Sequence, residues 1–270
     1  MSLFNINNQV VLITGGGGIL GGEMASYLLE NGATVIILDY KEEIVDDAIT
    51  RLKKKSEKVA GFVCNVLDEN SLQLVSDKII EQFGKIDILI NAAGGNMPGA
   101  TIGENKTIFD VSIDDFKKVV DLNLFGSILP ALVFGKEMVK NKNGVIINIS
   151  SMTAQSAITR VVGYSASKAA IDNFTKWLSV ELALKYGDGL RVNAIAPGFF
   201  IGNQNRDLLI NKDGSYTDRG NTIIKNTPMK RFGEAEELNG SIHYLCSDAS
   251  KFVTGIVIPI DGGFSAFSGV

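Results

Sequence analysis

Residues 9–39 of the chain read QVVLITGGGGILGGEMASYLLENGATVIILD, and this stretch predicts how the chain folds. An apolar run at 9–14 leads into a glycine-rich turn, a helical pattern follows at 20–31, and a second apolar run occupies 34–38. Both runs are continuously apolar, which is typical of strands buried on both faces. The stretch therefore predicts a strand, a crossover helix and a parallel neighbouring strand.

The same alternation continues along the rest of the chain. Five further strands are expected at Val59–Cys64, Ile86–Asn91, Gly144–Ile149, Leu190–Ala196 and Ile256–Ile260. Further helices are expected at 41–55, 69–83, 112–141, 163–187 and 234–247. Repeated βα units predict an α/β fold, a Rossmann-type doubly wound parallel sheet of seven strands with helices on both faces. Ligands of such sheets bind beyond the carboxyl ends of the strands.

We expect residues 1–270 to form one domain, because α/β domains often reach about 200–250 residues without splitting. One segment, 198–231, interrupts the alternation and is rich in Asn, Asp, Gly and Arg. Connections longer than about 12–15 residues are usually functional or disordered. We interpret this segment as a substrate lid containing short helices near 208–210 and 222–225; the alternative is a surface insertion without a role.

The composition argues against several classes of protein. The net charge is −4, from 26 basic and 30 acidic residues, and no basic tract indicates a nucleic-acid partner. Two cysteines and one histidine, without metal-ligand spacing, indicate neither a disulfide framework nor a metal site. Because the N-terminus carries no signal pattern and no uninterrupted apolar run reaches about 18 residues, we expect a cytoplasmic protein without a membrane partner.

The glycine-rich turn Thr14–Gly22 indicates a nucleotide site. Glycine lets the backbone approach a phosphate closely, and the helix that follows offers free N–H groups and a positive dipole end. Asp39 closes the second strand, 18 residues beyond Gly21, where a carboxylate can accept hydrogen bonds from an adenosine ribose. Because the same carboxylate would repel a 2′-phosphate, NAD is favoured over NADP.

Tyr164 and Lys168 are four residues apart on a predicted helix, which places them on one face. A free phenol has a pKa near 10, and a neighbouring cation favours its ionised form, so we expect Lys168 to lower the pKa of Tyr164. Ser151, at the end of a predicted strand, could add a hydroxyl. The three residues predict a proton-transfer site; the alternatives are Ser151 as a helix cap and Tyr164 in packing.

Taken together, these features resemble the short-chain dehydrogenase/reductase family over essentially the whole chain. The matching residues are Thr14-Gly15, Asp39, Asn91 to Gly94, Asn123, Ser151, Tyr164, Lys168, Pro197-Gly198 and Asp261 to Gly263. The resemblance implies an NAD-dependent enzyme that interconverts a ketone and an alcohol. It implies that Tyr164 is the general acid/base, that Lys168 lowers its pKa and holds the nicotinamide ribose, and that Ser151 binds the substrate oxygen. Asn123 would hold a water in a proton relay.

The glycine turn departs from the family pattern, which is Thr-Gly, three residues, then Gly-x-Gly. Ile19 stands at the middle glycine, and Gly18 lies one place earlier. Asn65 stands where an aspartate commonly contacts adenine. The cofactor contacts implied are Gly15, Gly18, Ile19, Leu20, Gly21, Asp39, Asn65, Val66, Asn91, Ala92, Ala93, Gly94, Tyr164, Lys168, Pro197 and Gly198.

Three regions are expected to surround the substrate: 94–101, 152–163 and the lid. Their polar amides and arginines suit a hydroxylated, anionic small molecule, because arginine binds carboxylates in a bidentate manner. The alternative is that the arginines face solvent or form structural salt bridges. The candidate substrate residues are Asn96, Ser151, Arg160, Tyr164, Asn203 and Arg206.

The segments Gly94–Asn96, Thr159–Val161, Pro197–Arg206 and Thr227–Gly233 resemble one subgroup of this family, the D-mannonate oxidoreductases, also called fructuronate reductases. That resemblance implies interconversion of D-fructuronate and D-mannonate in hexuronate catabolism.

Other readings of the sequence stay open. They are another sugar or polyol dehydrogenase, a 3-oxoacyl-carrier-protein reductase, and a cofactor-binding regulator without turnover. Asp39 and the negative net charge argue against the carrier-protein reductase, and the retained Tyr164, Lys168 and Ser151 argue against the regulator. The family resemblance also implies a homotetramer in which C-terminal tails, carrying Phe264 and Phe267, meet across an interface.

Overall fold

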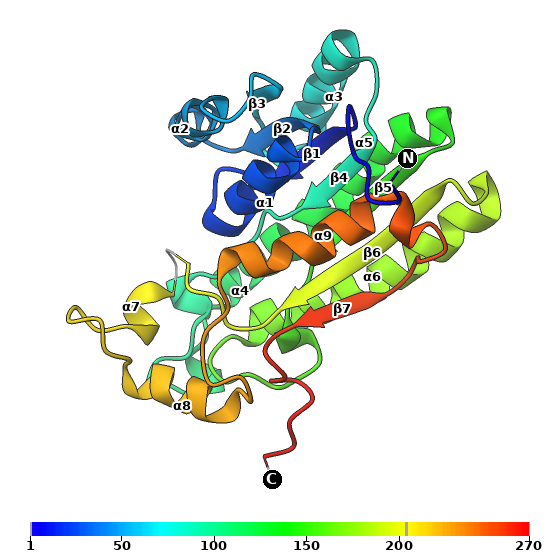
Figure 1. The fold of residues 1–270 in the computed structure, drawn as a ribbon. Helices are drawn as coiled ribbons and strands as arrows, with labels where there is room; N and C mark the ends of the chain where they lie inside the picture. Colours follow the sequence, from blue (N-terminus) through cyan, green and yellow to red (C-terminus); the bar gives the residue numbers. More distant parts are fainter. Residues whose placement is uncertain (1, 203–204, 270) are drawn as a thin grey trace.

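A computed structural model describes residues 2–202 and 205–269 of the protein (Figure 1). Seven parallel strands form one sheet in the order β3-β2-β1-β4-β5-β6-β7. The strands are β1 Val10–Thr14, β2 Thr34–Asp39, β3 Val59–Val63, β4 Ile88–Asn91, β5 Gly144–Ile149, β6 Leu190–Pro197 and β7 Val257–Ile260. The predicted fold class is confirmed, and each predicted strand lies within two residues of the observed one.

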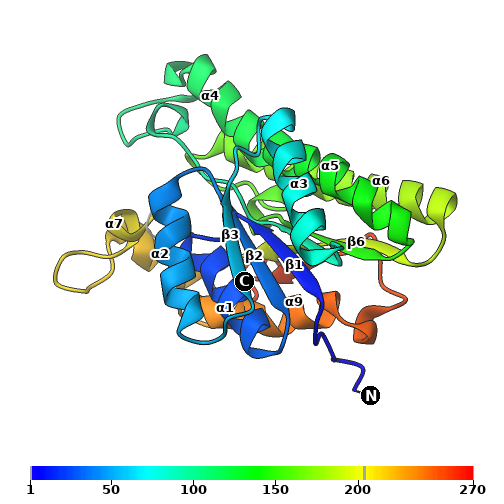
Figure 2. The same ribbon diagram turned by 90° about the horizontal axis from the view of Figure 1, so that it is seen from above.

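Helices cover both faces of the sheet. They are α1 Ile19–Glu30, α2 Glu42–Lys53, α3 Glu69–Phe83, α4 Ile113–Val120, α5 Gly126–Asn141, α6 Val162–Tyr186, α7 Arg206–Leu209, α8 Asp218–Asn226 and α9 Asn239–Cys246. One buried cluster joins the sheet to α1, α2 and α9, and a second joins it to α3, α5 and α6 (Figure 2).

Both faces of β1 are buried, as its continuous apolar sequence predicts. Val11 and Ile13 belong to the cluster under α1 and α9, whereas Val10 and Leu12 belong to the cluster under α3 and α5. Successive side chains of a strand point to opposite faces, so an uninterrupted apolar run supplies both cores at once.

The segment predicted as one helix over 112–141 is two helices separated by a π-helical segment, η3 Asp121–Phe125. The side chain of Asn123 explains the interruption. Its Nδ2 donates to the carbonyl oxygen of Val119 at 2.8 Å, and so shares the acceptor that the backbone N–H of Asn123 has in a regular α-helix. Single-turn π segments of this kind often occur at functional sites.

Ile113–Asn141 is long and apolar enough to cross a membrane by length and composition, and half of its most apolar window is buried inside the protein. In this fold α5 packs against α3, and α4 packs against α6. The stretch therefore has the position of a core helix that covers one face of the sheet.

The strand order reverses between β1 and β4, which makes their carboxyl ends the switch point of the sheet. Thr14 Oγ1, at the end of β1, accepts hydrogen bonds from the N–H groups of Ala92 and Ala93 at 3.1 and 3.2 Å. The ends of β1 and β4 are thereby held together at the edge where ligands of this fold bind.

The segment 198–231 contains α7 and α8, which lie beyond the carboxyl ends of β6 and β7 (Figure 1). Leu209 and Ile223 of this segment form a small apolar cluster with Phe232, which directly follows it. Thr217 caps α8 by accepting from the N–H of Gly220 at 3.1 Å, and its hydroxyl donates to the carbonyl of Leu208 at 2.7 Å. These bonds fix the start of α8 against the end of α7.

Candidate active site

The carboxyl end of β5 and the first turns of α6 bring Tyr164, Lys168 and Ser151 together. Lys168 Nζ lies 5.4 Å from the centroid of the Tyr164 ring, and the hydroxyl of Ser151 is near enough to the phenol to lower its pKa. Ser151 also caps the short helix that follows it, because its Oγ accepts from the N–H of Thr153 at 3.3 Å. The capping alternative and the proposed site role of Ser151 are therefore compatible.

Lys168 is buried, with 3% of its surface exposed, and its Nζ donates to the carbonyl oxygen of Ile149 at 2.7 Å. Ile149 is the last residue of β5, so the ammonium is anchored to the end of the strand. Burial lowers the pKa of Lys168 to about 8, and the nearby carboxylate of Asp172 partly opposes this shift.

The pKa of Tyr164 departs from the sequence prediction. We expected Lys168 to lower it, but burial raises the pKa of Tyr164 above its usual value, and the hydrogen bond from Ser151 only partly opposes the rise. Lys168 does not lower this pKa because of its geometry. Its ammonium lies over the ring and donates its hydrogen bond to the carbonyl oxygen of Ile149. Tyr164 is consequently a neutral phenol near pH 7, which suits a proton donor.

Asn123 holds the loop that follows β4. Its Nδ2 donates to the carbonyl of Gly95 at 2.6 Å, and its Oδ1 accepts from the N–H of Gly95 at 3.1 Å. A Cβ on Gly94 would lie 2.7 Å from Asn123 Oδ1 and 3.5 Å from Lys168 Nζ, so only glycine fits between them. The relay water expected at Asn123 remains a prediction.

Two buried polar groups beside the site were not anticipated from the sequence. The hydroxyl of Ser150 makes a short hydrogen bond to the carboxylate of Asp172, and burial raises the pKa of that carboxyl group. Asp172 follows Tyr164 and Lys168 at four-residue intervals, so it lies on the same face of α6. This spacing was the signal that could have found it.

Asn91 takes a different position from the one expected. The sequence counted it among the cofactor contacts, but its side chain points into the interior, where Nδ2 donates to Asn148 Oδ1 at 2.9 Å and to the carbonyl of Ser127 at 3.2 Å. Burial at the end of a central strand leads the Nδ2 group to partners inside the protein, whereas Oδ1 is buried without a partner among the described residues. Only the backbone of Asn91 is left to face a ligand.

The glycine turn has the donor set that a dinucleotide needs. No side chain caps the N-terminus of α1, and no acidic residue stands in its first turn, so its positive end is available to a pyrophosphate. Gly15 has a φ of 63°, and a Cβ there would lie 2.8 Å from the Cα of Ala93. A Cβ on Gly21 would lie 2.5 Å from the carbonyl oxygen of Gly15.

The unusual residue of the turn, Ile19, has a simple place in this geometry. It is the first residue of α1 and its side chain is 41% exposed, so it points away from the tightly packed side of the turn. Gly18 is less constrained than Gly21, because a Cβ there would meet only the carbonyl oxygen of Gly15, at 3.3 Å.

Asp39 lies at the end of β2 against this turn. Its Oδ2 accepts from the N–H of Gly17 at 3.2 Å, and its Oδ1 accepts from the N–H of Tyr40 at 2.9 Å. Each carboxylate oxygen can accept more than one bond, so capacity remains for a ribose diol. Asn65 is exposed and its Oδ1 accepts from the N–H of Leu67, whereas the neighbouring Val66 is buried.

Pro197 and Gly198 close β6 against the C-terminal tail. The N–H of Gly198 donates to the carbonyl of Ile260 at 2.9 Å, and a Cβ on Gly198 would lie 2.6 Å from the Cα of Asp261. Within the tail, Phe264 is partly buried and packs edge-on against Phe199, with ring centroids 5.4 Å apart. Phe264 is thus partly covered by its own chain, whereas Phe267 is 39% exposed.

The candidate substrate residues are spread over three segments. Asn96 donates through Nδ2 to Thr101 Oγ1 at 2.9 Å, and its Oδ1 is buried without a partner among the described residues. Arg206 is exposed at the start of α7, and Asn203 lies outside the described residues.

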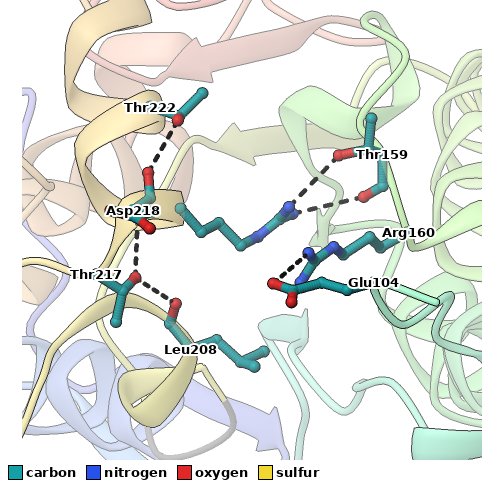
Figure 3. Close-up of polar contacts among 9 residues, drawn as sticks. Glu104, Thr159, Arg160, Leu208, Thr217, Asp218 and Thr222 are labelled. Carbon is teal, nitrogen blue, oxygen red and sulfur yellow. Dashed lines mark hydrogen bonds and ion pairs between the residues drawn. The ribbon is translucent and has the colours of Figure 1, made fainter.

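Arg160 faces Glu104 across the loop after β4, at an Nη2–Oε1 distance of 3.3 Å (Figure 3). The neighbouring guanidinium belongs to Arg219, which donates to Thr159 and whose pKa is lowered by burial and by the charge of Arg160. The sequence paired Arg160 with Arg206 and missed Arg219. The predicted lid helix near 222–225 begins after Arg219, whereas the observed α8 begins at Asp218 and includes it.

The chain is similar to known oxidoreductases over nearly its whole length. A sequence model of the family described as "Enoyl-(Acyl carrier protein) reductase" matches residues 18–265. An uncharacterized oxidoreductase of Bacillus subtilis is 44% identical over 98% of each protein. The 2-dehydro-3-deoxy-D-gluconate 5-dehydrogenase of Formosa agariphila is 34% identical, over all of this sequence and 97% of its own.

One solved structure is similar over nearly its whole length. A Haemophilus influenzae protein, provisionally described as a D-mannonate oxidoreductase and crystallised with bound NAD, is 43% identical. It superposes with a TM-score of 0.92, and the match covers 98% of both proteins.

The packing of the glycine turn predicts that Gly21→Ala destabilises the protein and weakens NADH binding. The added Cβ would meet the backbone of Gly15, so either the turn or α1 must shift, at a cost of about 1–3 kcal/mol. Gly18→Ala is the comparison variant, because its Cβ would meet only the carbonyl oxygen of Gly15, at 3.3 Å, so we expect a smaller loss of stability. Urea unfolding measures the stability of each variant, and fluorescence titration measures its affinity for NADH. Equal losses of stability and affinity in the two variants would contradict the packing argument.

The burial of Lys168 predicts a pH-dependent stability difference. Because its folded-state pKa of about 8 lies below its unfolded value, the cost of burying the charge is fully present at pH 7. That cost disappears as the pH rises from about 8 to about 10.5. We compare the unfolding free energy of Lys168→Met with that of wild type at each pH. We expect this difference to be more favourable to the variant at pH 7 than at pH 10, by up to about 3 kcal/mol.

Urea unfolding without added NAD at the two pH values checks this expectation. The lost hydrogen bond to Ile149 affects the variant at both pH values, so the difference between them isolates the charge. Lys176→Met, which removes an exposed lysine from the same helix, is the control. An identical pH response in the two variants would show that Lys168 is not desolvated.

Proposed function

The chain belongs to the short-chain dehydrogenase/reductase family, and we propose that it is an NAD-dependent oxidoreductase that interconverts D-fructuronate and D-mannonate. Oxidoreduction with a nicotinamide cofactor follows from the family. The cluster of Tyr164, Ser151 and Lys168 at the end of β5 is the observation that carries the proposal, because it offers a proton donor beside a buried cation.

Bound NADH would supply a hydride to the carbonyl carbon of the substrate. The protein's own residues supply orientation and one proton. The neighbouring hydroxyls of Ser151 and Tyr164 would both donate to the carbonyl oxygen, where negative charge develops. Tyr164 would then transfer its phenolic proton to that oxygen, and in the oxidation direction it would accept the proton back.

Lys168 would act on the phenolate that Tyr164 becomes. With a pKa of about 8, it is mostly an ammonium at pH 7, and its charge favours the ionised phenol as the proton leaves. Its position also suits a contact with the nicotinamide ribose. Asn123 would hold the relay water beside Gly95. It already fixes the loop at Gly95, and Gly94 of that loop lies between Asn123 and Lys168.

The preference for NAD over NADP is part of the proposal. Asp39 is held at the glycine turn by the N–H groups of Gly17 and Tyr40, so its carboxylate cannot swing away from a ribose 2′ position. A phosphate at that position would meet a like charge. The similarity to a protein that binds NAD supports this choice.

A sugar acid is the substrate that best fits the polar segments around the site. Asn96 and Arg160 supply an amide and a guanidinium, and two similar proteins carry names for sugar-acid oxidoreductases. Residues 198–231 would be the lid over this substrate. By family resemblance, the protein would be a cytoplasmic homotetramer.

The alternatives are another sugar or polyol dehydrogenase and a 3-oxoacyl-carrier-protein reductase. A carrier-protein reductase would need a basic surface for its acidic partner and, in most cases, NADPH. The net charge of −4 and the carboxylate of Asp39 are unfavourable to both requirements.

An NADH-oxidation assay tests the function across keto-sugar acids, uncharged keto-sugars and acetoacetyl thioesters. We expect the highest kcat/KM for a keto-sugar acid, with D-fructuronate first. Tyr164→Phe should lower kcat on that substrate by about 10²–10⁴-fold while NADH still binds, because the variant loses only the transferable proton. Tyr186→Phe, an exposed site on the same helix, is the control.

A clear preference for the thioester would replace the proposed function by the carrier-protein reductase. Retained turnover in Tyr164→Phe would remove this residue from the mechanism.

The role of Asp39 predicts that Asp39→Ala raises the ratio of kcat/KM for NADPH to that for NADH at least about tenfold, because the repulsion of the 2′-phosphate is removed. Asp47→Ala, which removes an exposed carboxylate from α2, should leave the ratio unchanged. Initial rates with both cofactors measure the ratio, and an unaltered value in Asp39→Ala would exclude the carboxylate as the selecting group.

A further inference from the structure

We propose that Arg160 and Arg219 together form the subsite for the substrate carboxylate, and that Glu104 occupies Arg160 until the substrate displaces it. The inference rests on the proposed function, because it assigns a binding group to the anionic end of a sugar acid. It keeps Arg160 from the candidate substrate residues and adds Arg219, where the sequence offered Arg206.

Arg219 has an unfavourable position that no internal partner explains. It stands in the first turn of α8, where the positive end of the helix dipole disfavours a cation. Among the described residues its guanidinium makes two long contacts, to Thr159 Oγ1 at 3.4 Å and to the carbonyl of Thr159 at 3.5 Å. In residues 2–202 and 205–269 it forms no ion pair, although it is only partly exposed.

Arg160 supplies the second cation of the subsite. Its φ of 79° lies in the left-handed region that residues with a side chain rarely adopt, and its carbonyl accepts from the N–H of Ile102 at 2.9 Å. Strained backbone of this kind is concentrated at ligand sites. Because Arg219 contacts the adjoining Thr159, the two guanidinium groups are neighbours, and burial and the charge of Arg160 both lower the pKa of Arg219.

Two partly buried cations side by side repel each other, and an anion between them removes the repulsion. A carboxylate suits the place, because each guanidinium can donate two parallel N–H bonds to it. Arg160 precedes Tyr164 by four residues, so their Cα atoms are at most about 14 Å apart. The proposal places the carbonyl of a six-carbon acid at Tyr164 and its carboxylate at this pair.

Glu104 shows how the subsite is satisfied within the protein itself. A single contact of 3.3 Å joins its Oε1 to Arg160 Nη2, and its side chain is 81% exposed, whereas that of Arg160 is 28% exposed (Figure 3). An exposed, single-contact ion pair is weak. A substrate carboxylate that contacts both arginines can therefore displace it, and Glu104 then returns to solvent on its own loop.

The test measures binding without turnover. D-mannonate added to the enzyme with NADH forms a complex in which both ligands are already reduced, so calorimetry gives its Kd directly. D-mannitol is the uncharged comparison. We expect Arg219→Gln to weaken D-mannonate binding at least about tenfold and to leave D-mannitol binding unchanged, with Arg219→Lys between Arg219→Gln and wild type.

Glu104→Gln should have the opposite effect, tightening D-mannonate binding several-fold without altering that of D-mannitol, because the competing carboxylate is gone. Lys212→Gln removes one charge from an exposed part of the lid and controls for the overall field. If Arg206→Gln, and not Arg219→Gln, weakens D-mannonate selectively, the proposed pair is wrong.

The outcomes separate this inference from the proposed function. In one outcome the wild type turns over sugar acids, but Arg219→Gln loses affinity equally for D-mannonate and D-mannitol. That result overturns the subsite and leaves the function standing. Charge-selective binding that depends on Arg219, without turnover of any sugar acid, supports the subsite and overturns the function. Failure of wild type to bind D-mannonate with NADH present overturns both.

Discussion

The structure depends on the fastening of the end of β1 to the end of β4. Thr14 Oγ1 accepts from two successive N–H groups after β4, and Gly15 packs against the same backbone so closely that no Cβ fits. The strand order reverses at this point, so the contact joins the half of the sheet that carries the glycine turn to the half that carries α6. In the proposed mechanism, the cofactor and the proton donor would meet because these two ends are held side by side.

Several features of the site oppose stability. An ammonium is buried at Lys168, a carboxyl group is buried at Asp172, and two guanidinium groups are neighbours at Arg160 and Arg219. Each is tolerated because the surrounding core is large and fully packed on both faces of the sheet. Unfavourable charge placement that is confined to one edge of a stable sheet is a pattern typical of functional sites.

Much of the fold could be predicted because its signals are local. Continuous apolar runs indicated the seven strands, and the 3.6-residue periodicity indicated most of the helices. The interruption at Asp121–Phe125 could not be predicted, since it depends on which carbonyl the Asn123 side chain reaches. Likewise, no local pattern shows that the amide of Asn91 turns inward or that Phe264 packs on Phe199.

The sequence by itself determined the sheet, the nucleotide turn, and the alignment of Tyr164 with Lys168, because spacing along one helix fixes which side chains share a face. Only the tertiary structure decided how these groups behave. The pKa of Tyr164 depends on its burial, and the neighbour of Arg160 depends on how the lid packs beside the loop at Thr159. Desolvation and contacts between distant segments are properties of the folded protein, and spacing along the sequence does not carry them.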